Sequence, residues 1–391
     1  MGAGPARERA RSARQDPRAP TRTTKKSLEP AGRLRRPFAC KASSHKTQPD
    51  TEPMTEPLPE IVVVAAIIRD RENRLCLSRR PEHKHQGGLW EFPGGKVEEG
   101  EPLERALARE LDEELGMQGA RSQPFMIVRH RYPDLRVTLH FREVTAYTGE
   151  PHGREGQPVE WVPLQELSSR QFPAANQPVV TALKLPRQLV IPPEGLGYQD
   201  VLAGIDRLDP DSQGLYLRQW SQSDALPELA ARCRQRGVRF WIRDDAHLAT
   251  REHAFGLHLT GLDGSGLLRE RASMGAGPAR ERARSARQDP RDLEDALQNF
   301  QGILSASCHN EQEIAQAVDW GAQMATLSPV HATPTHPDAK PLGWDHFRAL
   351  AEGKPLVFYA LGGVTPQDLD TALHHGAFGL AGIRAFWKNN E

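Results

Sequence analysis

The stretch GGKVEEGEPLERALARELDEELGM, residues 94–117, determines how the rest of this sequence is interpreted. A glycine pair and an acidic loop lead into a segment in which apolar residues recur at helical spacing. Pro102 suits a first helical turn, because its missing N–H would be unpaired there anyway. Gly116 stands where a left-handed C-terminal cap is expected. The pattern therefore predicts a helix whose apolar face is formed by Leu103, Ala106, Leu107, Leu111 and Leu115.

Three glutamates follow one face of this predicted helix. Glu110, Glu113 and Glu114 stand at positions i, i+3 and i+4, so their carboxylates converge. Like charges held this close repel one another. A hard divalent cation such as Mg²⁺, which takes oxygen ligands and keeps water and phosphate in its other positions, would offset the repulsion. The alternative is an ordinary solvated acidic helix, which three glutamates alone do not exclude.

The wider spacing favours the metal site. Gly95 is followed after five residues by Glu101, after seven more by Arg109-Glu110-Leu111, and then by Glu113-Glu114 and Gly116-Met117. This arrangement reproduces every defined position of the Nudix box, so the chain resembles the Nudix hydrolases. The resemblance implies hydrolysis of nucleoside diphosphates linked to another group, with Mg²⁺ as the cofactor and Mn²⁺ as its substitute.

Length and composition narrow the class of protein. At 391 residues, two or three domains are expected. The 51 basic residues balance 51 acidic ones, which favours neither a stable nucleic-acid complex nor a membrane as partner. The longest apolar run, residues 61–68, is far shorter than the roughly 20 residues that span a bilayer. A cytoplasmic protein without a disulfide framework or zinc site is expected, because no paired spacing links Cys40, Cys76, Cys233 and Cys308.

The N-terminal residues 1–57 are rich in Arg, Ala, Ser, Thr and Pro and lack hydrophobic periodicity, which predicts a disordered basic tail. A transit peptide, a nucleic-acid-binding tail, and an appended segment without a role that ends before Met54 are alternatives. Residues 1–18, MGAGPARERARSARQDPR, recur letter for letter as residues 274–291. The copy has no apolar face to stack, so we interpret residues 273–291 as a low-complexity insertion in a surface loop.

Two folded domains are expected after the tail. Residues 58–187 show strand patterns, the central helix, further strand patterns and a terminal helix, which predicts an α+β domain. Within it, residues 75–80 are expected to form a hairpin with the strand at residues 61–68. Residues 188–197, with Pro192-Pro193, are expected to be a linker. Strand and helix patterns then alternate through residues 198–391. The fold class is therefore an α/β/α sandwich of the Nudix type followed by a (β/α)8 TIM-barrel-like domain.

The first domain resembles, more narrowly, the MutT-type 8-oxo-dGTP diphosphatases. Outside the box, EFPGGK, GREGQP, EW and FPAANQPV carry this resemblance within residues 60–185. It implies that the metal is held by the Gly94 carbonyl and by the side chains of Glu110, Glu113, Glu114 and Glu155. It also implies a catalytic set in which Glu110 or Glu155 is the base and Glu101 and Arg109 order the loop through a buried ion pair, with Glu114 completing the set. The alternative for Glu155 is a plain turn carboxylate.

The same resemblance implies attack of water on the β-phosphorus, so that 8-oxo-dGTP yields 8-oxo-dGMP and pyrophosphate. Asn176 is the candidate for reading the base, because an amide offers a donor and an acceptor side by side to a guanine edge. Its alternative role is a turn former. Leu135 stands where an arginine is often seen in the family, which bears on discrimination against dGTP. The other implied substrate contacts are Arg80, His85, Asp134 and the backbone groups of Glu91, Phe92, Pro93 and Gly94, which line the cleft.

The second domain resembles thiamine-phosphate synthase, through LRQW, IRDD, GLHLTGLD, SASCH, SPVHATPTH and ALGGV. Ligands of a barrel bind at the C-terminal ends of its strands, where these stretches are expected. The matched positions for pyrophosphate, Mg²⁺ and phosphate are Arg218, Asp244, Asp263, Ser307, Thr333, Thr335 and Gly363. Trp220 and His336 replace two lysines of the family, and Arg243 replaces an asparagine. The loss of two cations weakens stabilisation of a departing pyrophosphate.

The favoured hypothesis is thus a MutT-type pyrophosphohydrolase with a barrel of open role. One alternative is a bifunctional protein whose barrel also joins thiamine-pathway phosphates into thiamine phosphate. Another is a phosphate-binding regulatory barrel. The unbroken box speaks against a chain in which both sites are degraded, and the replaced lysines speak against synthase activity.

Overall fold

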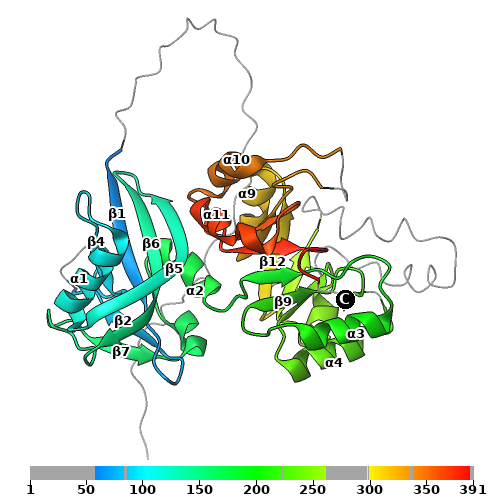
Figure 1. Cartoon of the computed structure of the whole chain (residues 1–391), viewed down its shortest axis with the longest axis horizontal. Helices are drawn as coiled ribbons and strands as arrows, with labels where there is room; N and C mark the ends of the chain where they lie inside the picture. The colour runs from blue at the N-terminus through cyan, green and yellow to red at the C-terminus, as the bar shows by residue number, and fades with distance from the viewer. Residues whose placement is uncertain are drawn as a thin grey trace, which may run out of the picture. The chain divides into compact units, whose positions relative to one another are not determined.

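The computed structural model of the protein describes residues 58–82, 86–221, 223–260, 297, 299–333 and 338–387 (Figure 1). The predicted tail and insertion, and the site candidates His85, Asp263 and Thr335, lie outside these residues. The described residues all fall in the second of two units into which the chain divides, which begins at Pro57. Its strands belong to two open sheets and one closed barrel.

The two open sheets build the first domain. The larger contains, in order, β4 (Gly94–Lys96), β1 (Glu60–Ile67), β6 (Arg136–Thr148) and β5 (Gln118–Arg131). In this sheet β1 is parallel to β6, and the other pairs are antiparallel. The smaller sheet is antiparallel and contains, in order, β3 (Trp90–Glu91), β2 (Leu75–Arg79) and β7 (Val159–Val162).

The predicted hairpin between residues 61–68 and 75–80 is wrong. Both edges of β1 are occupied, by β4 and by β6, so β2 pairs with β3 and β7 in the other sheet. The ends of the two strands are linked by an isolated bridge between Arg69 and Leu75 and by the Cys76 N–H, which donates to the Ile68 carbonyl at 3.0 Å.

Helices cover both faces of the larger sheet (Figure 1). Alternate side chains of β1 explain this: Val64 and Ala66 pack with the buried face of α1 (Leu103–Leu115), and Ala65 and Ile67 pack in the cluster that contains α2 (Gln177–Ala182). The predicted central helix and the α/β/α sandwich are therefore confirmed. Pro102 is the N-cap of α1, and Gly116 caps its other end with a φ of 70°. Two 3-10 helices precede α2, η1 (Leu164–Ser169) and η2 (Ala174–Asn176).

The predicted barrel is confirmed by a closed ring of parallel strands (Figure 1). The strands, in ring order, are β10 (Phe240–Arg243), β11 (Gly256–Leu259), β12 (Ile303–Cys308), β13 (Met324–Leu327), β14 (Val357–Leu361), β15 (Gly379–Gly382), β8 (Gln188–Val190) and β9 (Gln213–Tyr216). The described helices of this domain are α3 (Tyr198–Arg207), α4 (Leu226–Arg236), α5 (Ala246–Arg251), α9 (Glu311–Asp319), α10 (Gly343–Ala351), η3 (Pro366–Asp368) and α11 (Leu369–His374).

The expected linker, residues 188–197, is wrong in its first part, because β8 lies within it. Leu189 and Val190 are fully buried, and β8 pairs with β15 on one side and with β9 on the other. The strand is only three residues long and lies between prolines. Its sequence therefore resembles that of a linker, which explains the wrong prediction. The barrel therefore begins at Gln188.

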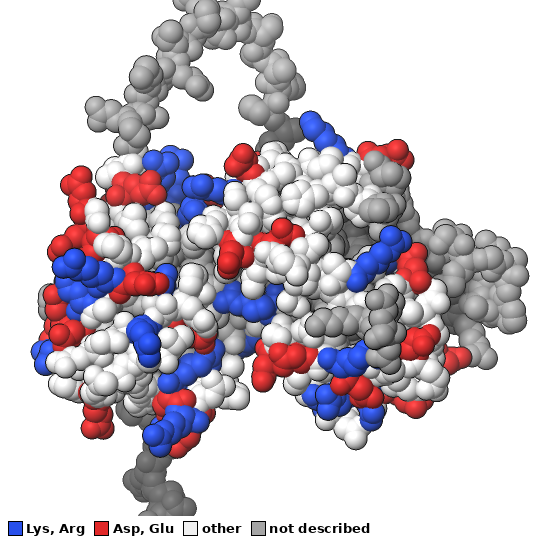
Figure 2. Space-filling model, viewed as in Figure 1, with Lys and Arg blue, Asp and Glu red and all other residues white. Residues whose placement is uncertain are grey.

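None of the described helices is long and apolar enough to cross a membrane. On the face of the molecule shown in Figure 2, basic and acidic side chains are interspersed rather than gathered into a field of one sign.

Candidate active site

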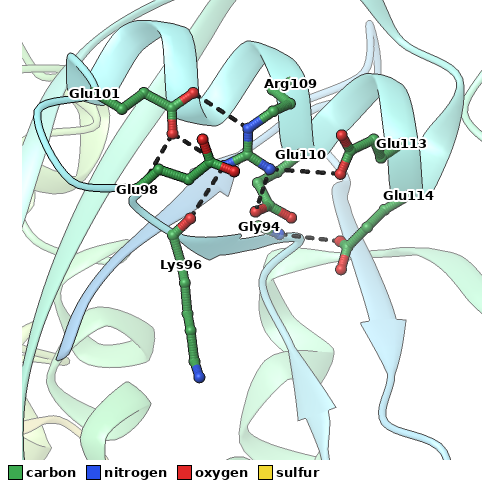
Figure 3. Close-up of polar contacts among 8 residues, drawn as sticks. All are labelled: Gly94, Lys96, Glu98, Glu101, Arg109, Glu110, Glu113 and Glu114. Carbon is green, nitrogen blue, oxygen red and sulfur yellow. Dashed lines mark hydrogen bonds and ion pairs between the residues drawn. The ribbon is translucent and has the colours of Figure 1, made fainter.

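Two glycines of β4, Gly94 and Gly95, bring the sheet against the carboxylates of α1, and Figure 3 shows Gly94 beside Glu114. The Gly94 N–H donates to Glu114 Oε2 at 3.2 Å. Gly94 has a φ of 146°, and a Cβ there would stand 2.1 Å from the Val64 carbonyl oxygen. A Cβ at Gly95 would stand 2.3 Å from the carboxylate carbon of Glu110. Gly94 is thus required by the backbone, and Gly95 by the space that the Glu110 carboxylate fills.

The guanidinium of Arg109 lies among the acidic side chains of this region (Figure 3). It forms a two-point ion pair with Glu101, with Nε–Oε1 at 3.2 Å and Nη2–Oε2 at 3.0 Å. Its Nη1 donates to Glu110 Oε1 at 2.8 Å and to Glu113 Oε2 at 3.4 Å. Its Nη2 also donates to the Lys96 carbonyl at 3.1 Å. Arg109 therefore joins the acidic loop, β4 and the carboxylates of α1.

The ion pair expected between Glu101 and Arg109 is present and is partly closed off from solvent. The Glu101 side chain is 9% exposed and also accepts the Glu98 N–H at 3.2 Å. The hydrogen bond from Arg109 lowers the pKa of the Glu101 carboxyl, and the same bond raises the pKa of Arg109. Both groups are therefore held in their charged forms, which keeps the loop closed against the helix.

Glu114 lies at the centre of a carboxylate cluster, which we define as Glu91, Glu110, Glu114 and Glu155. The pKa of the Glu114 carboxyl is raised to about 7, chiefly by burial and also by the negative charges of the other three members. The hydrogen bond from the Gly94 N–H acts in the opposite direction. Carboxylates that disfavour one another's charge in this way are stabilised by a cation.

The donor set of this region fits a hard divalent cation, because it consists of carboxylate and backbone oxygens, and the missing side chain of Gly95 lets the Glu110 carboxylate approach β4. As the side chains stand, Glu110 and Glu113 face Arg109. Across the described ranges, no three His, Cys, Asp or Glu side chains are arranged as ligands of a metal ion. Arg109 thus supplies the positive charge that Glu110 and Glu113 face.

A loop tied to the end of α1 positions Glu155. The Arg154 N–H donates to the Glu114 carbonyl at 2.9 Å, and the Gln157 side-chain amide donates to the same oxygen at 3.1 Å. The other atom of that amide, Gln157 Oε1, accepts the Glu155 N–H at 2.9 Å. Sequence reasoning did not single out Gln157, although it stands in the quoted GREGQP stretch.

The predicted substrate residues lie in three settings. Arg80 forms an ion pair with Glu91, a member of the carboxylate cluster, and so lies beside that cluster. Asn176 is the last residue of η2 and is 6% exposed, so its side-chain amide is almost completely shielded from solvent. Asp134 lies in the exposed turn between β5 and β6 and is not a member of the cluster.

The Phe92 ring and the Pro93 carbonyl make contacts within the first domain. The Phe92 ring is 4% exposed and packs between Phe172, with ring centroids 5.7 Å apart, and Phe141, at 5.5 Å. The Pro93 carbonyl accepts the Ala66 N–H at 2.7 Å. The Phe92 side chain and the Pro93 carbonyl are therefore both occupied within the protein.

In the barrel, the described candidates gather toward the C-terminal ends of the strands. Arg218, Asp244 and Gly363 follow β9, β10 and β14, Thr333 follows β13, and Ser307 lies near the end of β12. Arg218 pairs with Glu194 at 2.9 Å. His258, which sequence reasoning missed although it stands in GLHLTGLD, lies 1% exposed with Nδ1 2.9 Å from Ser305 Oγ and Nε2 2.8 Å from Ser307 Oγ.

Comparisons with known proteins match the two domains separately. A family model described as NUDIX domain matches residues 64–182, and one described as thiamine monophosphate synthase matches residues 287–386.

Three relatives show how far each match extends. The 8-oxo-dGTP diphosphatase of Escherichia coli (strain K12) is 40% identical over 127 residues, which are 32% of this chain and 98% of that protein. The CTP pyrophosphohydrolase of the same strain is 35% identical over 122 residues, 31% of this chain and 90% of that protein. The thiamine-phosphate synthase of Synechocystis sp. is 28% identical over 173 residues, 44% of this chain and 42% of that protein. The chain thus spans nearly all of the first two relatives and less than half of the third.

Proposed function

Because the chain belongs to the Nudix hydrolase family through residues 64–182, we propose that its first domain hydrolyses 8-oxo-dGTP to 8-oxo-dGMP and pyrophosphate, with Mg²⁺ as the cofactor. The observation that carries the proposal is the carboxylate cluster around Glu114, beside the two glycines of β4. The identity of the chain to a relative named 8-oxo-dGTP diphosphatase, over 98% of that relative, supports the choice of substrate.

In this proposal the cation is held by the Gly94 carbonyl together with Glu110, Glu113, Glu114 and Glu155. When bound, Mg²⁺ would neutralise charge on the phosphate oxygens and lower the pKa of the attacking water. Glu110 accepts the proton from that water, for which a carboxylate within hydrogen-bond reach is suited. Removal of oxidised guanine nucleotides from the precursor pool would then be the role of the domain.

Arg109 and Glu101 position the helix carboxylates in this proposal. Their two-point ion pair ties the acidic loop to α1, and the bond from Arg109 to the Lys96 carbonyl ties the helix to β4. Removing either partner would leave a charge without its counterpart in a partly closed setting. Both residues therefore act through the placement of Glu110 and Glu113.

Base selection is assigned to Asn176. Its nearly closed setting supports this role, because a hydrogen bond discriminates strongly where water does not compete for the donor and acceptor. Because one relative is named CTP pyrophosphohydrolase, pyrimidine triphosphates are the alternative class of substrate to purine triphosphates. A side chain that reads a purine edge should not favour CTP.

The test is hydrolysis of 8-oxo-dGTP, dGTP and CTP by the full chain, with the products separated by anion-exchange chromatography. We expect monophosphate and pyrophosphate from 8-oxo-dGTP in preference to the other two, with Mg²⁺ required. Glu114→Gln should abolish hydrolysis of every substrate. Asn176→Ala should retain hydrolysis and lose the preference.

Glu104→Gln is the matched control, because Glu104 lies in the first turn of the same helix, is 71% exposed and pairs with Arg142 at 2.8 Å. Its activity should equal that of the natural chain. Preference for CTP would replace the proposed substrate by a pyrimidine nucleotide. An intact chain that hydrolyses none of the three triphosphates would reject the proposal.

A further inference from the structure

Arg187, the residue directly before β8, contacts both the first domain and the barrel. Its guanidinium lies over the Phe125 ring of β5, 4.5 Å from the ring centroid, and over the Phe378 ring of the barrel, at 4.2 Å. Its Nη1 donates to the backbone carbonyls of the same two residues, each at 2.8 Å. Burial lowers the pKa of this guanidinium to about 10. Arg187 therefore ties β5 to the residue that precedes β15.

A second arginine, Arg239, connects the two domains from the barrel. It stands directly before β10, and its Nη1 donates to the Lys184 carbonyl of the first domain at 2.9 Å. Its Nη2 donates to the carbonyls of Pro210 and Asp211, at 2.7 and 3.0 Å, in the loop before β9. Burial lowers the pKa of this guanidinium as well. Arg239 therefore fixes Lys184 to the barrel.

The Lys184 carbonyl lies at the far end of the helical segment that begins at Asn176. Asn176 is the N-cap of α2, and helical bonding continues beyond α2, because the Lys184 N–H donates to the Thr181 carbonyl at 3.0 Å. Carbonyls at the end of a helix lack partners within it, so donation by a guanidinium is favourable there. We call residues 174–184 the Asn176 segment. The bond from Arg239 anchors the end of this segment opposite to Asn176.

The rest of the Asn176 segment packs against β5 and the barrel. β5 contacts η2, and α2 contacts β14. Val179 and Val180 of α2 are buried in the same apolar cluster as Phe125 of β5 and Val357 of β14. Close-packed interiors of this kind transmit strain from one element to the next. A shift of β5 or of the barrel would therefore also move η2 and α2, and with them Asn176.

We propose that the barrel is a positioning element for the first domain, in which Arg187 and Arg239 hold the Asn176 segment so that the Asn176 amide meets the nucleotide base. This inference rests on the proposed function. The contacts of the two arginines lead to β5 and the Asn176 segment, whereas the carboxylate cluster is centred on α1. Arg187 and Arg239 are thus positioning residues for base selection and have no part in the hydrolytic step.

The experiment compares kcat and KM for 8-oxo-dGTP and dGTP in the full natural chain, Arg187→Met and Arg239→Met. Methionine retains apolar bulk and removes the donors. Each variant should lower the ratio of kcat/KM for 8-oxo-dGTP to that for dGTP roughly 10-fold, mainly through KM, because a misplacement far from the reacting atoms can lower a rate by up to about 100-fold. A purely structural role would reduce the active fraction and both values by one factor, which leaves the ratio unchanged.

Arg236→Met is the matched control, because Arg236 Nη2 donates to the Asp206 carbonyl at 3.0 Å, a contact within the barrel. Its ratio should equal that of the natural chain. Arg187→Lys keeps the charge and a donor, so it should recover part of the ratio, and it replaces Arg187→Met if that variant does not fold. An unchanged ratio in the variants of both Arg187 and Arg239 would overturn the proposal.

Amide hydrogen exchange, followed by mass spectrometry without nucleotide, separates this inference from the proposed function. In Arg187→Met and Arg239→Met, exchange should become faster in residues 174–184 and stay unchanged in α1. If the natural chain does not prefer 8-oxo-dGTP, base selection by Asn176 fails, and exchange alone decides whether the barrel holds the segment. Equal exchange in the natural chain and both variants would overturn the inference, whichever nucleotide is hydrolysed.

Discussion

Replacing Gly95 by alanine would place a methyl group in the space that the Glu110 carboxylate now occupies. The added Cβ would stand 2.3 Å from the carboxylate carbon, and ordinary contact begins at 3.4 Å. The carboxylate must therefore withdraw by about 1 Å. A displacement of this size at a reacting group can lower the rate by about 10²-fold. We expect a fall of that order in kcat/KM for 8-oxo-dGTP.

The fold should tolerate the same change. Gly95 is absent from the described residues with positive φ, and its obstructing neighbour is the far end of a flexible side chain. The free energy of unfolding should thus change by less than about 1 kcal/mol. Gly94→Ala is the informative contrast, because its Cβ would meet the Val64 carbonyl at 2.1 Å and its φ is 146°. That variant should lose stability as well as activity.

The measurement is steady-state hydrolysis together with urea unfolding for both variants. Gly197→Ala, at the N-cap of α3 in the barrel, controls for a glycine replacement at negative φ. The reasoning is refuted if Gly95→Ala hydrolyses 8-oxo-dGTP at the natural rate, because the position of Glu110 would then not matter. Loss of stability in Gly95→Ala equal to that of Gly94→Ala would also contradict it.

Three further outcomes are expected. Leu111→Ala should destabilise the first domain by about 2–5 kcal/mol in urea unfolding, because Leu111 is fully buried between α1 and β1; a change near zero would contradict this packing. Burial raises the pKa of Cys76, Cys233 and Cys308 to about 12, so iodoacetamide should leave these thiols unlabelled in the native chain, as read by peptide mass mapping. EDTA should stop nucleotide hydrolysis without changing the circular dichroism spectrum, and excess Mg²⁺ should restore it; hydrolysis that persists in EDTA would exclude the metal site.

The central helix could be predicted from sequence because its signals are local. The spacing of its apolar residues, Pro102 and Gly116 are all read within one short segment, and α1 begins directly after Pro102 and is capped by Gly116. The pairing of β2 could not, since it depends on which edges β4 and β6 leave open on β1. The predicted hairpin assumed that β1 and β2 pair because they are neighbours in sequence, whereas β4 and β6 occupy both edges of β1.

The residues of the candidate site could be predicted from the sequence, but the contacts between their side chains could not. Helical spacing places Glu110 and Glu113 near one another, yet it does not show that both face Arg109. The burial of Asn176 and the contact of Gln157 with the end of α1 arise from segments that are distant in the chain. Replacement of an asparagine by Arg243 was visible, whereas its hold on Asp244 needed the structure.

The short strand β8 has a consequence for any attempt to separate the two domains. A truncated chain that starts within residues 191–197, where the sequence looks dispensable, would lack β8. This strand lies between β15 and β9 and pairs with both. Both of those strands would then present rows of unpaired backbone groups, the kind of open edge that recruits other chains into aggregates. The cut would also delete the Pro186 carbonyl, which accepts the buried hydroxyl of Tyr359. An isolated barrel should therefore start no later than Pro186.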